Sequence, residues 1–309
     1  PAETWTRRFG DCKDKAYLMS VVLSRLGIPA VPALATTRHG KGVRDFVPAA
    51  TAFNHVIVQA QLGKQTLWLD PTLTQQRGTA AAIDIMDYGY VLPIADGIVD
   101  LREVMRTPAS RKQVNVMEKY RPSDDGKTID LLIVSEYLGG SADNIRRDIA
   151  ARGREEMGKN YAEYYRKRFG ELDVLSPFAT NDDQVQNKLT ITESYRLKQA
   201  WDEKTGSTKS LTVYADSMDQ DTKLPDTIDR KAPLSLNYPM QYRHEHILEL
   251  PKGWTWLGTA ENESIKSSAF DYERSMVQAE QTVSIRQSVK FNEDSVPVKN
   301  LPDFLSKMR

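Results

Sequence analysis

The sequence has one cysteine among 309 residues, and its 42 Lys and Arg residues balance its 42 Asp and Glu residues. A single thiol excludes an internal disulfide, so the fold does not depend on the redox compartment and the thiol stays chemically free. The even charge, without a basic stripe or a polybasic run, argues against nucleic acid as a partner. The longest apolar runs, such as residues 131–134, fall far short of the ~20 residues of a membrane span. We therefore predict neither nucleic-acid binding nor a membrane span.

The length predicts about two domains, each large enough for its own core. The best linker candidate is "RTPASRKQ", residues 106–113. We expect a first domain at 1–108 and a β-rich second domain at 109–309. The chain opens on Pro1, without an initiator Met or a charged and then apolar leader. This opening indicates a processed or excised piece of a longer protein, whose signal peptide would belong to the missing part.

A helix of about fifteen residues is predicted to start at the cysteine. Asp11 is the expected N-cap, Cys12 takes the first helical position, and Asp14 at N3 makes a variant of the capping box. Gly27 can adopt the left-handed conformation that ends a helix, and Pro29 prevents continuation. Apolar residues at steps of three and four predict one buried face, made of Ala16, Met19, Val22, Leu23 and Leu26.

Strands follow this helix. "IPAVPALATT" is one, and "FNHVIVQA" and "KQTLWLD" are two more, rich in β-branched and aromatic residues and joined by a plausible tight hairpin at residues 62–65. A helix followed by a hairpin indicates an α+β fold.

The second domain is predicted to be mostly antiparallel β with one helical insert. "VNVMEKY" and "TIDLLIVSEYL" form a hairpin, and Ser141 then caps a helical stretch to about Phe169, which Gly153 and Gly158 break or soften. Alternating segments follow between turn residues: "LTITESYRL", "SLTVYA", "RHEHILELP" and "TVSIRQSVKF".

The position of Cys12 suits a nucleophile. The unsatisfied N–H groups and the macrodipole of a helix N-terminus stabilise a thiolate, and the backbone N–H of Cys12 could form half of an oxyanion hole. The plainer alternative is that Cys12 is a small buried residue.

The hairpin adds a base and an acid. With Gly63 and Lys64 as the two loop residues, Ile57 lies opposite Asp70, and His55 shares the face of Ile57 because side chains alternate along a strand. His55 and Asp70 are then diagonal neighbours within reach of a hydrogen bond, whereas a three-residue loop would separate them onto opposite faces. Taken singly, His55 could be a core histidine and Asp70 a turn residue. Together with Cys12 they supply a nucleophile, a base and an orienting acid.

The stretches "FGDCKDKAYLMSVVLSRLGIPA", "FNHVIVQA" and "LWLDPT" resemble the transglutaminase-like core of papain-type cysteine enzymes, in particular a bacterial branch in which β-rich domains flank the core. The resemblance covers about residues 1–95. It implies a papain-like first domain, a Cys-His-Asp triad of Cys12, His55 and Asp70, and a periplasmic or extracellular location. Family cores usually carry helices before the cysteine, so a missing N-terminal domain of the same protein is a candidate partner that completes the cleft.

Other residues carry weaker signals. The indole N–H of Trp5 is a candidate oxyanion donor, with ordinary packing as the alternative. We expect His39 to be a solvated loop histidine, with a place in the cleft as the alternative. We expect Lys13 to be a charge on the helix surface. His244 and His246 could share a metal ion, but no third ligand is signalled, so a coincidental pair is favoured. No calcium-loop pattern is present, so no metal and no cofactor are predicted.

Three functions compete. The favoured one is an enzyme: thiol-dependent acyl transfer or hydrolysis of a peptide or protein amide, as in a peptidase, an amidase or a transglutaminase. The second is a non-catalytic module, built on an inherited core, that binds a peptide, a glycan or a protein. The third is a scaffold part of a larger envelope protein.

Overall fold

The computed structural model describes residues 1–105, 112–206, 208–223, 229–259 and 261–308. The chain divides into two units, Pro1–Ser110 and Arg111–Arg309. Of the linker expected at 106–113, residues 106–111 lie outside the described residues. The α+β fold class is confirmed, because helices accompany mostly antiparallel sheets in the described chain. Among the described residues, no helix combines the length and apolar character needed to cross a bilayer.

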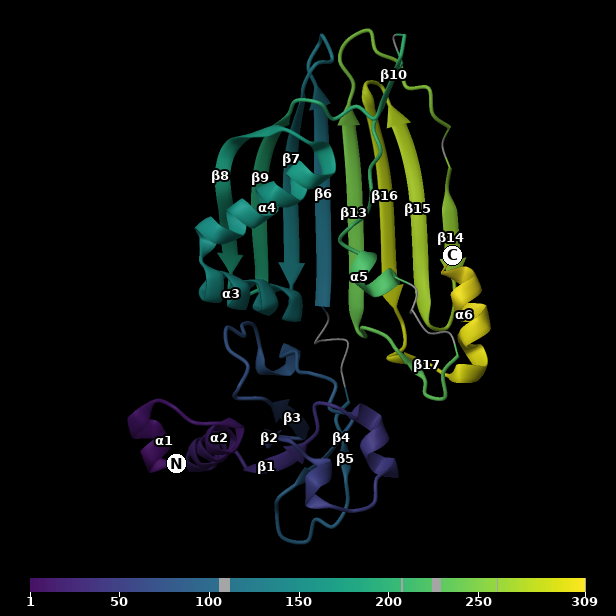
Figure 1. Ribbon diagram of the computed structural model, residues 1–309. Helices are drawn as coiled ribbons and strands as arrows, with labels where there is room; N and C mark the ends of the chain where they lie inside the picture. Colours follow the sequence, from purple (N-terminus) through teal and green to yellow (C-terminus); the bar gives the residue numbers. More distant parts are fainter. Residues whose placement is uncertain (106–111, 207, 224–228, 260, 309) are drawn as a thin grey trace. The chain divides into compact units, whose positions relative to one another are not determined.

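The first unit contains a five-stranded sheet in the order β3-β2-β1-β4-β5, with helix α2 packed against β1 and β2 (Figure 1). Two small apolar clusters form its core. Val56 and Val58 of β2 meet Ala16 of α2, and the alternate residue Ile57 meets Tyr88 and Val91. The elements are α1 (Ala2–Arg7), α2 (Cys12–Arg25), β1 (Ala30–Ala35), η1 (Gly40–Asp45), η2 (Ala50–Ala52), β2 (His55–Leu62), β3 (Gln65–Leu69), η3 (Ala80–Ala82), β4 (Tyr90–Pro93) and β5 (Arg102–Glu103).

Helix α2 starts where the sequence predicts. The Asp11 side chain accepts hydrogen bonds from the backbone N–H groups of Lys13 and Asp14, and the Asp14 carboxylate accepts one from the Asp11 N–H, so the capping box is complete. The predicted buried face is partly wrong, because Val22 is 39% and Leu26 71% exposed. The helix covers only two strands, so a narrow stripe made of Ala16, Met19, Ser20 and Leu23 is sufficient to cover them.

The second unit is built on an eight-stranded sheet in the order β14-β15-β16-β13-β6-β7-β9-β8. All neighbouring described strands in it are antiparallel except β6 and β13, which run parallel at the centre. The long strands are β6 (Lys112–Pro122), β7 (Ile129–Leu138), β8 (Leu172–Asp183), β9 (Lys188–Leu197), β13 (Met240–Glu249), β15 (Phe270–Ala279) and β16 (Thr282–Phe291).

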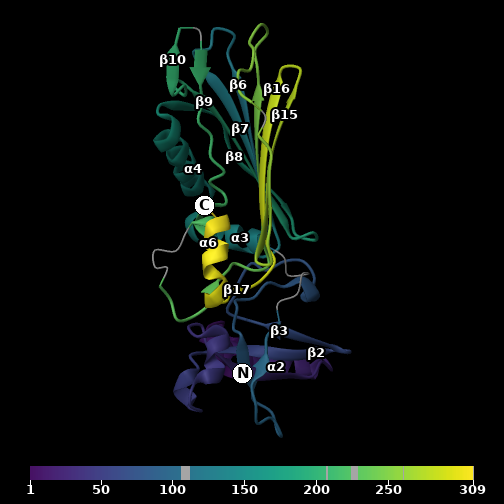
Figure 2. The ribbon, with the colours of Figure 1, turned by 90° about the vertical axis from the view of Figure 1, so that its right-hand side faces the viewer.

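Helices lie on one face of this sheet, as the edge-on view in Figure 2 shows for α4 and α6. Residues of both helices join the main core with alternate strand residues such as Leu131 and Phe270. The remaining elements are α3 (Gly140–Arg152), α4 (Arg154–Phe169), β10 (Glu203–Thr205), β11 (Thr208–Ser210), α5 (Asp219–Thr222), β12 (Leu234–Ser235), β14 (Glu263–Lys266), β17 (Ser295–Val296), η5 (Val298–Asn300) and α6 (Leu301–Lys307).

The helical insert differs from its prediction in its details. The N-cap is Gly139, with φ of 60°, and Ser141 lies inside α3. Gly153, with φ of 83°, separates α3 from α4 as expected. Gly158 does not interrupt α4. A Cβ there would lie 2.9 Å from Phe178 of β8, so this glycine permits close packing of helix on strand.

One predicted strand is mostly absent. Of "SLTVYA", residues 210–215, only Ser210 belongs to a strand, the end of β11. Its alternation has another cause, since Leu211, Val213 and Ala215 pack against the main core without pairing in the sheet.

Candidate active site

The hairpin of β2 and β3 has the predicted register. Val58 lies opposite Leu69 and Leu62 opposite Gln65, so Gly63 and Lys64 are the two loop residues. His55 is the first residue of β2, and Asp70 follows the last residue of β3. This register brings the two side chains together, and His55 Nε2 lies 2.9 Å from Asp70 Oδ2.

Asp70 is 3% exposed and accepts hydrogen bonds on both carboxylate oxygens. Oδ1 accepts from the backbone N–H of Thr72 at 2.9 Å and from its hydroxyl at 2.7 Å. Oδ2 accepts from His55 and from the Tyr88 hydroxyl. Burial raises the pKa of Asp70, but the hydrogen bonds from His55, Tyr88 and Thr72 outweigh it and lower this pKa from 3.8 to about 2. The carboxylate is therefore charged at neutral pH.

The charge on Asp70 fixes the role of each imidazole nitrogen. A carboxylate only accepts hydrogen bonds. Nε2 of His55 therefore carries a hydrogen and donates a hydrogen bond to Oδ2 of Asp70. In the neutral imidazole, Nδ1 then keeps its lone pair. His55 is thereby held in the tautomer that presents Nδ1 as a base.

Tyr88 is part of this arrangement, although the sequence did not single it out as a site residue. Its side chain is 1% exposed, its hydroxyl donates to Asp70, and its ring stacks on His55 with centroids 5.7 Å apart. Burial raises the pKa of Tyr88, and so do the hydrogen bond to Asp70 and the negative charges of Asp70 and Cys12. The local sequence around it is a Tyr-Gly-Tyr turn in a segment without clear periodicity, which gives no indication of a site residue.

The turn that carries Tyr88 requires glycine. Gly89 has φ of 62°, and a Cβ at this position would lie 2.2 Å from the backbone nitrogen of Lys41. The backbone of η1 therefore passes directly against the turn, which fixes the position of the preceding tyrosine.

Cys12 is the first residue of α2 and is partly exposed. A thiolate there is close enough to Tyr88 for its charge to act on the tyrosine hydroxyl, and His55 stacks on that same ring. Among the described residues, to which both belong, the sulfur makes no hydrogen bond with His55. The structure thus joins His55 and Asp70 directly, and among the described contacts none joins Cys12 to either of them.

The weaker candidates lie at the surface. Trp5 is 55% exposed, and the guanidinium of Arg8 lies 4.5 Å from its ring, so the indole is not part of the core. Its role as an oxyanion donor stays a prediction. His39 is exposed beside Phe46, as expected for a loop histidine. Lys13 is an exposed charge that pairs with Asp11 at 3.4 Å.

The second unit brings a third side chain with a potential metal ligand beside the two histidines. Glu118 of β6 lies with His244 and His246 of β13, and one ligand atom of each falls within 4.8 Å of the others. The sequence signalled no third ligand for this histidine pair, and the structure supplies a candidate in Glu118; the expectation of a coincidental pair stays a prediction. Parallel pairing of β6 with β13, which no local pattern reveals, places Glu118 directly opposite His246.

Comparisons with known proteins give a fold and one domain family. A family model described as "Domain of Unknown Function with solved-structure structure (DUF3858)" matches residues 211–309. No curated protein matches. The chain resembles a solved structure titled "putative protease" from Parabacteroides distasonis ATCC 8503, with 12% identity and a TM-score of 0.50. That match covers 99% of this chain and 43% of the other, so this chain spans less than half of its length.

Proposed function

We propose that this chain performs thiol-dependent hydrolysis of a peptide or protein amide, with Cys12 as nucleophile, His55 as base and Asp70 as orienting acid. The observation that carries the proposal is the 2.9 Å contact between His55 Nε2 and a buried, ionised Asp70, in the unit that also holds a partly exposed cysteine at a helix N-terminus. The same residues carry the proposed membership of the transglutaminase-like superfamily.

The proposed reaction has two stages, formation of a thioester on Cys12 and its hydrolysis, and His55 acts in both. His55 Nδ1 takes the proton of the Cys12 thiol, and the sulfur attacks the amide carbonyl carbon. The carbon–nitrogen bond then breaks, and the imidazolium returns its proton to the leaving amine. Water, activated by the same nitrogen, adds to the thioester and releases the acid and the thiol. Asp70 stays ionised throughout and stabilises the imidazolium, while the backbone N–H of Cys12 donates to the developing oxyanion.

The fold comparison supports this proposal at the level of class. The protein titled "putative protease" shares the fold over 99% of this chain. We accordingly propose a peptide as substrate and, by the family resemblance, a periplasmic or extracellular location. Transfer to a second amine instead of water is the transglutaminase form of the same chemistry.

One observation favours the alternative of a non-catalytic binding module. Within the described chain the sulfur of Cys12 and the imidazole of His55 are not hydrogen bonded, so the nucleophile must approach Nδ1 before reaction. Catalytic hydrogen bonds are often long before substrate binds. The reactivity of the thiol separates the two functions.

The test uses the single cysteine, because every alkylation event then reports on Cys12. Iodoacetamide rates are measured by intact mass between pH 5 and 9 on the whole chain. We expect fast alkylation well below pH 8, and a rate about 10- to 100-fold lower at pH 6.5 in His55→Ala. Asp70→Asn changes the rate in the same direction. The matched control is His39→Ala, which removes an exposed histidine of the same unit.

Equal, slow rates in the wild type, His55→Ala and His39→Ala contradict the proposal. A peptide-like electrophilic probe then identifies the labelled residue by mass spectrometry. Label on Cys12 that disappears in His55→Ala but persists in His39→Ala supports the hydrolase, and label elsewhere argues for the binding module.

A further inference from the structure

Three polar side chains lie on the helix-covered face of the second unit's sheet, where apolar residues are the rule. Glu118, His244 and His246 are between 1% and 3% exposed. Glu118 pairs with His246 across the parallel β6–β13 junction, and His244 precedes His246 by two residues on the same face. Burial of polar groups costs free energy unless each finds a partner, so this cluster requires an explanation.

The carboxylate is well partnered on one side. Glu118 Oε1 accepts from the Tyr165 hydroxyl at 2.9 Å and lies 3.3 Å from Nη1 of Arg168. Its other oxygen, Oε2, accepts from the Tyr120 hydroxyl and points to the two imidazoles. These contacts hold the carboxylate in a fixed orientation.

The imidazoles are not partnered in this way. Nε2 of His244 and both nitrogens of His246 are buried and find no hydrogen-bond partner among the residues that the structure describes. Nδ1 of His246 lies 3.2 Å and Nε2 of His244 3.8 Å from Glu118 Oε2, without the alignment of a hydrogen bond. Three unsatisfied nitrogens on two buried rings would be costly, so the arrangement points to a group that they bind.

The charges nearby favour a cation. Arg168 is shared between Glu118 and Asp216, whose Oδ2 lies 3.1 Å from its guanidinium. When both imidazoles are neutral, the two carboxylates outweigh the single guanidinium, so a net negative charge lies beside the rings.

The distances suit a transition metal. Ligands about 2.0–2.1 Å from a tetrahedral zinc ion lie about 3.3 Å from one another, close to the separations of 3.2 and 3.8 Å found here. Two imidazoles and one carboxylate match Zn²⁺ or its neighbours, whereas Mg²⁺ and Ca²⁺ prefer oxygen ligands. The Ser217 hydroxyl lies 3.0 Å from Nδ1 of His244, and a hydrogen bond there leaves Nε2 as the metal-binding nitrogen.

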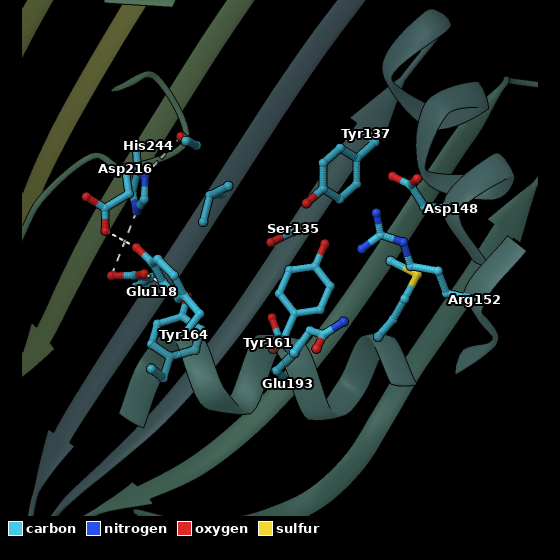
Figure 3. A pocket seen from close by; sticks show the side chains of 15 residues that line it. Glu118, Ser135, Tyr137, Asp148, Arg152, Tyr161, Tyr164, Glu193, Asp216 and His244 are labelled. Carbon is cyan, nitrogen blue, oxygen red and sulfur yellow. Dashed lines mark hydrogen bonds and ion pairs between the residues drawn. The ribbon is translucent and has the colours of Figure 1, made fainter. Parts of the chain in front are cut away.

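We propose that Glu118 Oε2, His244 Nε2 and His246 Nδ1 bind one divalent transition-metal ion such as Zn²⁺. Glu118 and His244 also line a cavity of about 410 Å³ between α4 and the sheet, where Figure 3 shows them at the end that holds Asp216 and Tyr164. A fourth coordination position is therefore accessible to water or to a small ligand in this cavity. Because the ligands come from β6 and β13, the ion also links the two halves of the sheet.

The experiment is a metal titration of the whole chain in a Cys12→Ser background, which removes the thiol as a competing ligand and makes the result independent of the proposed hydrolase. After EDTA treatment and dialysis, Co²⁺ is added as a spectroscopic probe and Zn²⁺ as a competitor. We expect one equivalent of Co²⁺ with visible absorption, displaced by Zn²⁺. In His244→Ala and His246→Ala we expect binding at least about 100-fold weaker. Loss of a residue that only hydrogen bonds to a metal ligand lowers metal affinity by about 10- to 100-fold, and loss of the ligand itself should lower it more.

His39→Ala is the matched control and keeps full binding. Since Glu118→Gln could disturb the fold around Arg168, histidine-selective NMR of the Cys12→Ser chain gives a reading that needs no variant of the cluster. Zn²⁺ is expected to shift two of the four histidine signals and to leave those of His39 and His55 in place. Absence of micromolar binding, or binding that survives in the His244→Ala/His246→Ala double variant, overturns the proposal and leaves buried water or a protonated imidazole as the partner of these rings.

Discussion

At Asp70, four hydrogen bonds converge on one buried carboxylate, two on each oxygen. Three different residues donate them, and each constrains a different part of the site. Thr72 fixes the turn after β3, the bond from His55 sets the tautomer of the imidazole, and Tyr88 binds the acid while its ring stacks on His55. The orientation of the base therefore depends on residues that take no part in bond making.

Tyr88→Phe tests this dependence at the scale of one hydroxyl. The ring keeps its packing, but Asp70 loses a donor, so the pKa of Asp70 rises and the free energy of unfolding falls by about 1.5–3 kcal/mol at pH 7. Urea unfolding of the whole chain measures the change. Tyr90→Phe is the control, since the Tyr90 oxygen accepts a hydrogen bond from exposed Arg44, and we expect less than about 0.5 kcal/mol there. Equal effects of the two substitutions would show that the Asp70 contact adds nothing.

At the scale of an element, the turn before β4 is sterically confined. Gly89 combines a positive φ with direct apposition to the backbone of η1, whereas Gly97 also has a positive φ, of 77°, but open space around its Cα. A side chain at either position would be strained by the positive φ, but only at Gly89 would it also collide with another chain segment.

Gly89→Ala is expected to cost about 3 kcal/mol or more, and Gly97→Ala only about 1 kcal/mol, because a left-handed backbone penalises both but only the first meets another chain segment. Thermal and urea unfolding give the two free energies. Displacement of the turn would also move Tyr88, so Gly89→Ala slows alkylation of Cys12 while Gly97→Ala does not. Similar free energies for both variants would contradict the close approach.

At the scale of the whole molecule, two buried carboxylates, Asp70 in the first unit and Glu193 in the second, contribute to stability with opposite pH dependence. The pKa of Asp70 is lower in the folded state, about 2 against 3.8, so about 2 kcal/mol of stability in the first unit is present above pH 4 and lost as the pH falls towards 2. Glu193 in the second unit is the reverse case. Burial, opposed by a hydrogen bond from Tyr195 and aided by the charge of Glu118, raises the pKa of Glu193 from 4.5 to about 7. The neutral Glu193 carboxyl therefore favours folding of the second unit below pH 4.5. The free energy of unfolding falls by about 3 kcal/mol as the pH rises to 7 and the group ionises.

Glu193→Gln therefore stabilises the second unit by about 3 kcal/mol at pH 8 and has little effect at pH 4, because the amide still accepts from the Tyr195 hydroxyl without a charge to desolvate. Unfolding curves at both pH values, followed by tryptophan fluorescence, measure the difference. The control is Glu136→Gln on the other face of the same sheet, where the carboxylate is half-exposed and paired with Lys188. A gain at pH 4 equal to that at pH 8 would contradict a raised pKa at Glu193.

Local features of this molecule could be predicted from the sequence. The cap of α2 depends on residues within four positions, and the parity of a two-residue loop suffices to place His55 near Asp70. Features that join distant segments could not be predicted. Tyr88 reaches Asp70 from a segment without periodicity, and Glu118 meets the histidines only through parallel pairing of strands far apart in the chain. In "SLTVYA", alternate residues pack against the core although they are not paired in a sheet, so the sequence pattern of the segment resembles that of a strand.

The parallel pairing of β6 with β13 also bears on how the second unit is made. A nascent chain that has emerged only as far as β9 has one completed half of the sheet, with β6 as an open edge and its hydrogen-bonding groups unsatisfied until β13 arrives. The strands of this sheet that pair across the greatest separation in sequence are thus β6 and β13, at its centre and not at its edges. Ribosome-bound intermediates of that length should be the ones that recruit chaperones, and truncations before β13 should leave the half made of β6, β7, β9 and β8 without the other half of the sheet.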